Sequence, residues 1–249
     1  AILCPTFFFS VRYGIGTDYE SYIRIFNLIS TGQDTRMEWA YFLINKTVAY
    51  FGGSIEVVFF LVGIIMFLFI YLTLKDHRKV ISPGLGMFIF ILFYYQMSFN
   101  TIRQVVAVAV LLYSFKFIKD RYLIRFLLLI ILASGFHISS LIMIPVYFIY
   151  NLIGKQQRRI TRLLFYTVTL LIVIGLDKLL IPILSNVESL NYYLKYLDQE
   201  STLESGFGFI IRQLPFLAVG FYLYTYIGKY DKNFSFYYFM FIVSILFGF

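Results

Sequence analysis

Long apolar runs separated by short charged loops are the feature that most constrains this chain. A membrane-spanning helix needs about 20 mostly apolar residues. The candidate spans are residues 1–12, 57–74, 84–98, 102–118, 122–136, 137–152, 163–184, 208–228 and 234–249. Apolar residues make up 60% of the chain and the mean hydropathy is +0.81, which excludes the soluble classes. We predict an all-α, polytopic integral membrane protein with about nine or more spans, forming a single transmembrane domain over residues 1–249.

Several features qualify this prediction. The chain starts without a methionine and stops inside an apolar run, so we expect it to be the ordered part of a longer protein. Cys4 is the one cysteine, which excludes an internal disulfide framework. The short stretches 122–136 and 137–152 are either two helices that meet at residues 135–137 or one long span with a break. Both alternatives predict a polar site at His137.

Charge predicts which side of the membrane each loop occupies. Loops 75–79, 116–125, 155–162 and 229–232 hold 13 of the 21 Lys and Arg residues but 3 of the 13 Asp and Glu residues. By the positive-inside rule these loops are cytoplasmic. The external side is then formed by residues 13–56, 97–103, 134–140 and 185–212. Within it, residues 38–51 predict a helix at the membrane interface, and residues 185–208 predict a polar loop or short helix.

Basic side chains gather at the predicted external ends of the helices. Arg103 and Arg212 each follow an isoleucine, precede a glutamine, and are predicted in the first turn of a helix that begins outside. Arg12 ends the first span, and His137 opens the helix 137–152. Arginines beside helix N-termini form a site suited to an anion such as phosphate. For any one arginine the commoner role is that of an interfacial anchor, and a membrane histidine is as often a packed hydrogen-bonding group as a base.

Other site classes find no support in the sequence. It contains no Walker A motif, no dinucleotide-binding glycine pattern, no HExxH and no Cys/His metal spacing. The basic charge follows membrane topology, so we expect no nucleic-acid partner. No carboxylates cluster at ligand spacing, so we expect neither a metal nor another cofactor.

Five short motifs occur in order within residues 12–149. They are Arg12, "GTDYESY" from residue 16, "EWAYFLIN" from residue 38, "NTIRQ" from residue 100 and "FHIS" from residue 136. In these motifs the chain resembles the EpsG-like branch of the Wzy-type polysaccharide polymerases. Beyond residue 148 the likeness rests on hydropathy and on Arg212 with the glutamine that follows it.

The resemblance implies a glycosyltransferase of the bacterial inner membrane with a GT-C-like architecture. It would join undecaprenyl-pyrophosphate-linked oligosaccharide repeat units on the outer (periplasmic) face, producing surface polysaccharide such as O-antigen, capsule or exopolysaccharide. A chain-length regulator and a flippase are possible protein partners.

The resemblance also assigns roles to residues. Positioned arginines would stabilise the charge that develops on the leaving pyrophosphate, and a base would take the proton of the attacking sugar hydroxyl. The candidate bases are His137, Asp18 and Glu38. The candidate substrate-binding residues are Arg12, Tyr19, Asn100, Arg103, Gln104 and Arg212.

Three other activities remain open at this point. A glycan ligase would use nearly the same donor site and pass the finished chain to another lipid acceptor. A membrane O-acyltransferase could use His137 as its base, although no paired Asn/His signature is present. A transporter or flippase of lipid-linked glycans would need polar residues spread through the membrane depth, whereas here they gather at the outer helix ends.

The predicted sidedness can be tested by labelling single cysteines in a chain that lacks Cys4. Cysteines at Ser30 and Ser201 should react with an impermeant maleimide on intact cells, because both positions are predicted outside. A cysteine at Gln157 should stay unlabelled until the cells are opened. The reverse labelling pattern would contradict the topology.

Overall fold

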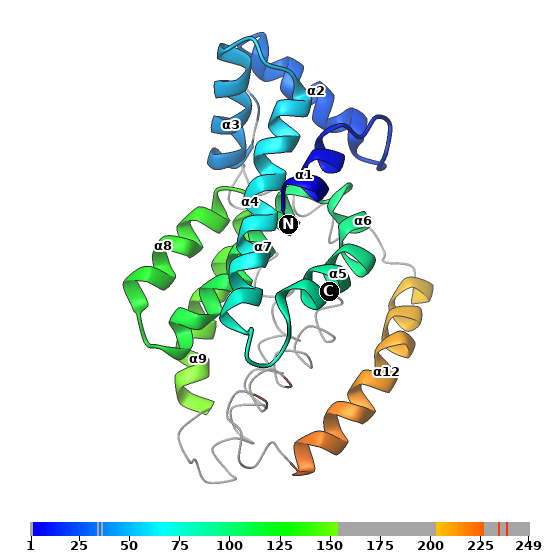
Figure 1. Cartoon of the computed structure of the whole chain (residues 1–249), viewed down its shortest axis with the longest axis vertical. Coiled ribbons are helices and arrows are strands. Elements are labelled where there is room, and N and C mark those ends of the chain that lie inside the picture. Colours follow the sequence, from blue (N-terminus) through cyan, green and yellow to red (C-terminus); the bar gives the residue numbers. More distant parts are fainter. Residues whose placement is uncertain are drawn as a thin grey trace. The chain divides into compact units, whose positions relative to one another are not determined.

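The computed structural model describes residues 2–33, 35, 37–153, 203–226, 234 and 238. Every regular element within these residues is a helix (Figure 1), in agreement with the predicted all-α class. Contacts between Cα atoms divide the chain into two units, Ala1–Phe148 and Ile149–Phe249, and each is considered by itself. The single domain predicted over residues 1–249 stays a prediction.

The first unit holds most of the described helices. They are α1 (Leu3–Ser10), α2 (Tyr19–Ser30), α3 (Trp39–Tyr50), α4 (Ile55–Asp76), α5 (Pro83–Phe93), α6 (Tyr95–Ser98), α7 (Ile102–Lys119), α8 (Leu123–Ser134), the 3-10 helix η1 (Ile138–Ile142) and the start of α9 (Met143–Ile153). The second unit contributes α12 (Leu203–Tyr226).

Helix α4 forms the centre of the first unit and packs against α1 and α7, and α7 packs against α8. Its side chains Phe59, Val62 and Met66 are fully buried. A Cβ atom at Gly63 would lie 2.9 Å from Cδ1 of Phe9, so the glycine allows α1 to lie close against α4. The buried apolar stripe continues on α7, and the two helices form one core.

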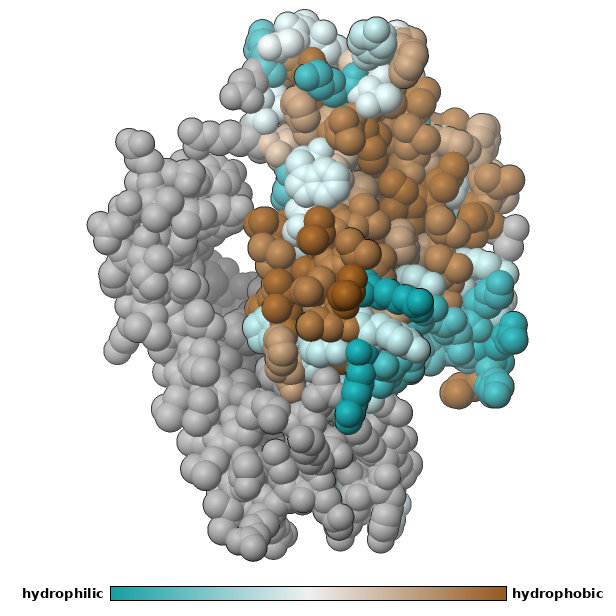
Figure 2. Space-filling model, turned by 90° about the vertical axis from the view of Figure 1, so that its left-hand side faces the viewer, coloured by the Kyte–Doolittle hydropathy of each residue, from teal (hydrophilic) through white to brown (hydrophobic). Residues whose placement is uncertain are grey.

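Helix α4 is also the one described helix that is long and apolar enough to cross a membrane. Shorter apolar helices are α5, α8 and the segment Ile138–Phe148. Many large apolar side chains remain exposed, among them Leu68 on α4 and Leu128 on α8. Figure 2 shows hydrophobic surface across the middle of the described part, with hydrophilic patches above and below it. A surface of this kind suits contact with lipid.

The structure refines the predicted spans. The span predicted over residues 84–98 divides at Tyr94 into α5 and the short α6. Residues 122–152 form separate helices, because α8 ends at Ser134 and η1 begins at Ile138, which confirms the two-helix alternative. The spans predicted at 163–184 and, apart from residues 234 and 238, at 234–249 lie outside the described residues. So do the loops 155–162 and 229–232 and most of the loop 185–208.

Two helices occupy the external segment 13–56. Helix α3 confirms the helix predicted over residues 38–51. Helix α2 was not predicted, although its buried residues Tyr19, Tyr22, Phe26 and Ile29 recur at intervals of three and four. That spacing is the pattern of one helical face. It did not predict a helix, because two of the four residues are tyrosines in a polar segment, where a run of apolar residues is absent.

The contacts at the helix ends can be compared with the sidedness that charge predicts, which stays a prediction. Residues from the predicted external segments 13–56, 97–103 and 134–140 contact one another: Tyr22 bonds to Asn100, and Ala40 bonds to Gly135. At the C-terminal ends of α4 and α7, the Asp76 carboxylate and the Lys116 ammonium lie 3.0 Å apart. Both of these residues belong to loops predicted to be cytoplasmic. Each of these contacts therefore joins segments that are predicted to lie on the same side of the membrane.

Candidate functional site

Three residues from distant parts of the sequence meet at the end of the first unit that is predicted to be external. Arg103 Nη1 donates a hydrogen bond to Glu38 Oε2, and the two side chains form an ion pair. His137 Nδ1 lies 3.5 Å from the other carboxylate oxygen, Oε1. Arg103 and His137 keep 28% and 33% of their side chains exposed, against 16% for Glu38. We call these three residues the Glu38 cluster. Its carboxylate is the inner group and its two basic groups remain accessible.

The start of α3 places Glu38 next to His137. Glu38 is the N-cap residue of α3, where the first backbone N–H groups of a helix lack partners within the helix. Two of them, on Ala40 and Tyr41, donate to the Gly135 carbonyl at 2.9 and 3.1 Å. Gly135 lies two residues before His137, so the same turn caps α3 and carries the histidine.

The start of α7 places Arg103. A positive charge in the first turn of a helix is unfavourable because the helix dipole is positive at that end. The Glu38 carboxylate offsets this cost for Arg103, whose guanidinium also lies 5.9 Å from the centre of the Tyr41 ring. Tyr22 fixes the preceding turn, since its hydroxyl donates to the Asn100 carbonyl at 2.7 Å and accepts from the Ile102 N–H at 3.2 Å.

Electrostatics keep Glu38 ionised. Partial burial by itself disfavours the charged carboxylate, but the contact with His137 and the charge of Arg103 outweigh it and lower the pKa of Glu38 below its usual 4.5. At neutral pH the cluster therefore contains a carboxylate with a guanidinium on one oxygen and an imidazole near the other. This arrangement holds the imidazole ring by its Nδ1 edge.

Arg12 lies in a separate, buried environment. Its residue exposure is 3%, and its guanidinium carbon lies 4.5 to 5.0 Å from the ring centres of Phe9, Phe59 and Phe99. None of its three guanidinium nitrogens has a hydrogen-bond partner in the described part of the chain. Cation–π contact offsets part of the cost of burying this charge.

An aromatic path connects Arg12 with the Glu38 cluster. The Phe59 ring contacts the Tyr22 ring, which contacts the Tyr41 ring, at centroid distances of 6.2 and 6.1 Å. Arg12 lies over Phe59 at one end and Arg103 over Tyr41 at the other. The two arginines are thus held by one set of packed rings, though they do not contact each other.

The other predicted site residues fall outside the cluster. Tyr19 is buried with 3% exposure in the core, and Gln104 is exposed one residue after Arg103. Asp18 is exposed at the N-cap of α2, with Thr17 Oγ1 3.5 Å from its Oδ1. Asn100 accepts the Thr17 N–H at 2.8 Å through its side-chain oxygen.

The predicted start of the helix that carries Arg212 was wrong. Helix α12 begins at Leu203, not near residue 208, so Arg212 lies in the helix interior rather than in its first turn. The apolar pattern placed the helix start too late, because the polar residues Glu204 and Ser205 were assigned to the preceding loop. The side chain of Arg212 lies outside the described residues.

Sequence reasoning assigned no role to three residues that build the site. Tyr22 and Tyr41 belong to the motifs that carry the family resemblance, and Gly135 precedes the "FHIS" motif. Their positions in or next to these motifs were the available clue. Their contacts, of Tyr22 and Tyr41 with the start of α7 and of Gly135 with the start of α3, join segments far apart in the chain and could not be predicted from it. Among the described residues, no group of three or more His, Cys, Asp or Glu could hold a metal ion.

Comparison with known families identifies the chain. The model of the EpsG family matches residues 1–249, and the chain belongs to this family, which is related to the Wzy polymerases. It is therefore a membrane protein of polysaccharide biosynthesis. No curated protein and no solved structure matches it significantly.

Gly135→Ala should disturb the contact between α3 and the His137 turn. A Cβ atom there would lie 2.5 Å from Cε2 of Trp39 and 2.6 Å from Cβ of Ala40, closer than packed atoms tolerate. Overpacking of this kind costs about 1–3 kcal/mol, so the apparent melting temperature of the purified protein should fall. Gly84→Ala is the matched control, since a Cβ atom there meets nothing within 4 Å. Equal melting temperatures for the two variants would contradict the close contact at Gly135.

Glu38 should make the thermal stability of the folded protein depend on pH in the acidic range. Because its pKa is lowered in the folded protein, its contribution is complete above the usual carboxyl pKa and is lost as pH falls through the lower folded-state value. The melting temperature of the wild type should therefore fall more steeply below about pH 4.5 than that of Glu38→Gln, which has no proton to gain. Parallel pH profiles would show that the carboxylate is not stabilised by its neighbours.

Proposed function

We propose that this chain joins lipid-pyrophosphate-linked oligosaccharide repeat units into a polysaccharide at the outer face of the bacterial inner membrane. Membership of the EpsG family supports polymerisation. The observation that carries the proposal is the Glu38 cluster: one carboxylate holds a guanidinium and an imidazole together at the external end of the helices. A phosphate-binding group and a base are the two groups that the reaction requires.

In the proposed reaction a hydroxyl oxygen of the incoming repeat unit attacks the anomeric carbon of the growing chain. The bond from that carbon to the pyrophosphate oxygen breaks, and undecaprenyl pyrophosphate leaves with the electron pair. The hydroxyl proton passes to His137, whose Nδ1 edge faces Glu38 and whose Nε2 is then the proton acceptor. Glu38 stabilises the imidazolium that forms, as an orienting carboxylate does for a catalytic histidine. Asp18, which makes no contact with His137 or Arg103, is not required.

Arg103 is proposed to bind the departing pyrophosphate. Its Nη1 is paired with Glu38, which fixes the plane of the guanidinium, while 28% of the side chain remains exposed for a ligand. A guanidinium presents paired donors to phosphate oxygens, and the N-terminus of α7 adds backbone dipoles of the same sign. The burial of Arg12 favours a supporting role for that residue over direct contact with phosphate.

The charge pattern supports the proposed position of the site in the membrane. The Glu38 cluster lies at the ends of helices opposite to the ion pair of Asp76 and Lys116, and those two residues border the basic loops. We therefore place the site on the outer face, within a fold of about nine or more spans and GT-C-like architecture. A chain-length regulator and a flippase remain expected partners.

A polymerase, a ligase and a transporter give different products from purified protein and lipid-linked repeat units. A polymerase forms a ladder of lengthened chains and releases undecaprenyl pyrophosphate. A ligase forms no ladder and transfers glycan only when another lipid acceptor is supplied, and a transporter forms no new glycosidic bond. The proposal requires the ladder, and it requires the ladder to form in the presence of a chelator because the arginines, not a metal, neutralise the pyrophosphate.

Arg103→Lys tests the proposed phosphate contact in that assay. Lysine keeps the positive charge and reaches the interface as well as arginine does, but it loses the paired donors. The rate of ladder formation should fall about 100-fold or more, by analogy with the loss of one positioned transition-state donor, while expression stays normal. Arg78→Lys, the same change at an exposed residue of the loop 75–79, should have no effect. Equal rates for both variants would leave Arg103 as a simple membrane anchor.

A further inference from the structure

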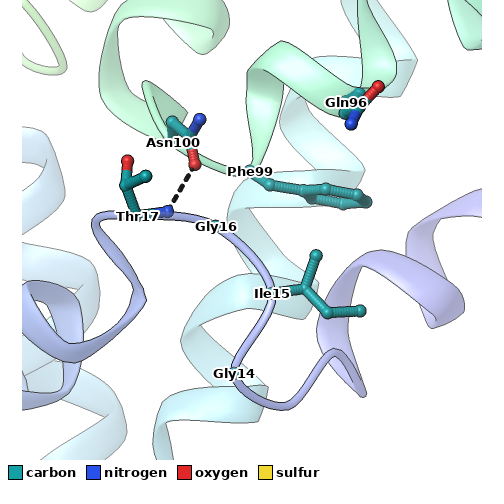
Figure 3. Close-up of a pocket in the computed structure, with 7 residues that line it drawn as sticks. All are labelled: Gly14, Ile15, Gly16, Thr17, Gln96, Phe99 and Asn100. Atoms are coloured by element: carbon teal, nitrogen blue, oxygen red, sulfur yellow. Dashed lines mark hydrogen bonds between the residues drawn. The ribbon is translucent and has the colours of Figure 1, made fainter.

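A cavity of about 380 Å³ lies next to the start of α7, close in sequence to the Glu38 cluster but lined by different residues. One wall is the loop of residues 14–17, and the other is formed by Gln96, Phe99 and Asn100 (Figure 3). The volume falls in the range of about 300–1,000 Å³ that is typical of small-molecule sites. No step of the proposed mechanism uses Gln96, Phe99 or the loop.

The polar groups in this cavity are all uncharged. The side-chain oxygen of Asn100 accepts the Thr17 N–H, but its amide NH₂ group has no partner within the described part of the chain, and Figure 3 shows this nitrogen pointing away from the bond to Thr17. Gln96 is exposed, and its amide makes no hydrogen bond to a described residue. Two free amide groups suit a ligand rich in hydroxyl groups, and none of the residues that line the cavity carries a charge that could bind pyrophosphate.

Phe99 supplies an apolar surface of fixed orientation. Its ring stacks with Phe9 at 5.7 Å and meets the edge of Tyr95 at 4.8 Å, and Arg12 lies 5.0 Å from its centre. In Figure 3 the ring lies between the side chains of Gln96 and Ile15. The C–H face of a pyranose ring packs on such an aromatic surface while its hydroxyl groups bond to neighbouring amides.

The loop opposite Phe99 approaches so closely that it requires a glycine. At Gly16, φ is +105°, and a Cβ atom would lie 2.7 Å from the Asn100 side-chain oxygen and 3.0 Å from the Phe99 carbonyl oxygen. Any other residue would push the loop away and break the bond from Thr17 to Asn100. The cavity is therefore a formed feature of the fold and not a gap between unrelated segments.

We propose that this cavity is a sugar subsite that binds one uncharged pyranose unit of the lipid-linked oligosaccharide. The assignment rests on the proposed function for the identity of the ligand. The subsite is fixed relative to the Glu38 cluster, because Tyr22 bonds to both the Asn100 carbonyl and the Ile102 N–H, one residue before Arg103. The charged cluster binds the pyrophosphate, and the neutral cavity recognises the sugar. The sugar can belong to the donor chain or to the incoming unit.

The test measures binding of two separate probes to the purified full chain. One probe is the repeat-unit oligosaccharide released from the host polysaccharide without its lipid pyrophosphate, and the other is undecaprenyl pyrophosphate alone. Gln96→Ala and Asn100→Asp should each weaken oligosaccharide binding about fivefold to tenfold, as the loss of one neutral hydrogen bond does. Gln96→Ala, which changes no charge, should leave lipid binding unchanged. Asn100→Asp keeps an oxygen that can accept the Thr17 N–H, but it replaces the NH₂ donors by a second, charged oxygen, so its result is compared with that of Gln96→Ala, which adds no charge. Gln33→Ala, at another exposed external glutamine, is the matched control and should bind both probes normally.

The binding and ladder assays together separate failure of the subsite from failure of the polymerase proposal. Unchanged oligosaccharide binding in both variants, or no oligosaccharide binding by the wild type, overturns the subsite. Oligosaccharide binding that depends on Gln96 and Asn100 in a protein that forms no ladder upholds the subsite and overturns the polymerase proposal. In the ladder assay, a variant whose KM rises for the incoming unit alone assigns the sugar to that unit, and a rise for the growing chain assigns it to the donor.

Discussion

One carboxylate, that of Glu38, connects three segments that are separated by up to about a hundred residues. A partly buried carboxylate requires positive or hydrogen-bonding partners, and Glu38 finds them in Arg103 at the start of α7 and His137 after α8. Arg103 has the converse need, because a cation is unfavourable in the first turn of a helix. The Gly135 carbonyl completes the junction by capping α3. The contact thus holds together the N-terminal ends of α3 and α7 and the C-terminal end of α8.

The residues around this junction divide into a rigid support and two kinds of binding surface. Packed rings of Phe59, Tyr22 and Tyr41 extend from the buried Arg12 to Arg103, and side chains held in this way keep reacting groups in place. Beyond the support, we propose that the charged cluster binds the anionic part of the substrate and that the cavity beside Asn100 binds the sugar part. A lipid-linked oligosaccharide has the same two parts.

The sequence predicted the helical class, the external helix at 38–51 and the break near His137, because hydropathy, charge and helix-breaking residues act locally. It also named Glu38, Arg103 and His137 as separate candidates. It could not predict that these three meet while Asp18 does not, since their contact depends on how α3, α7 and α8 pack. Helix α2 was missed because its buried face contains tyrosines, and the start of α12 was misplaced because Glu204 and Ser205 interrupt the apolar pattern in its first turn. Side-chain burial, as at Arg12, is likewise a property of packing.

A double-mutant cycle on Glu38 and His137 tests the central claim most directly. The rate of ladder formation would be measured for Glu38→Gln, His137→Gln and the double variant, each at matched protein level. If Glu38 orients His137 as well as Arg103, the two mutated residues are coupled: the double variant loses more activity than His137→Gln alone, because Arg103 also loses its partner, but clearly less than the product of the two single losses. Losses that multiply in the double variant would show that the two side chains act independently, and would contradict this account of the site.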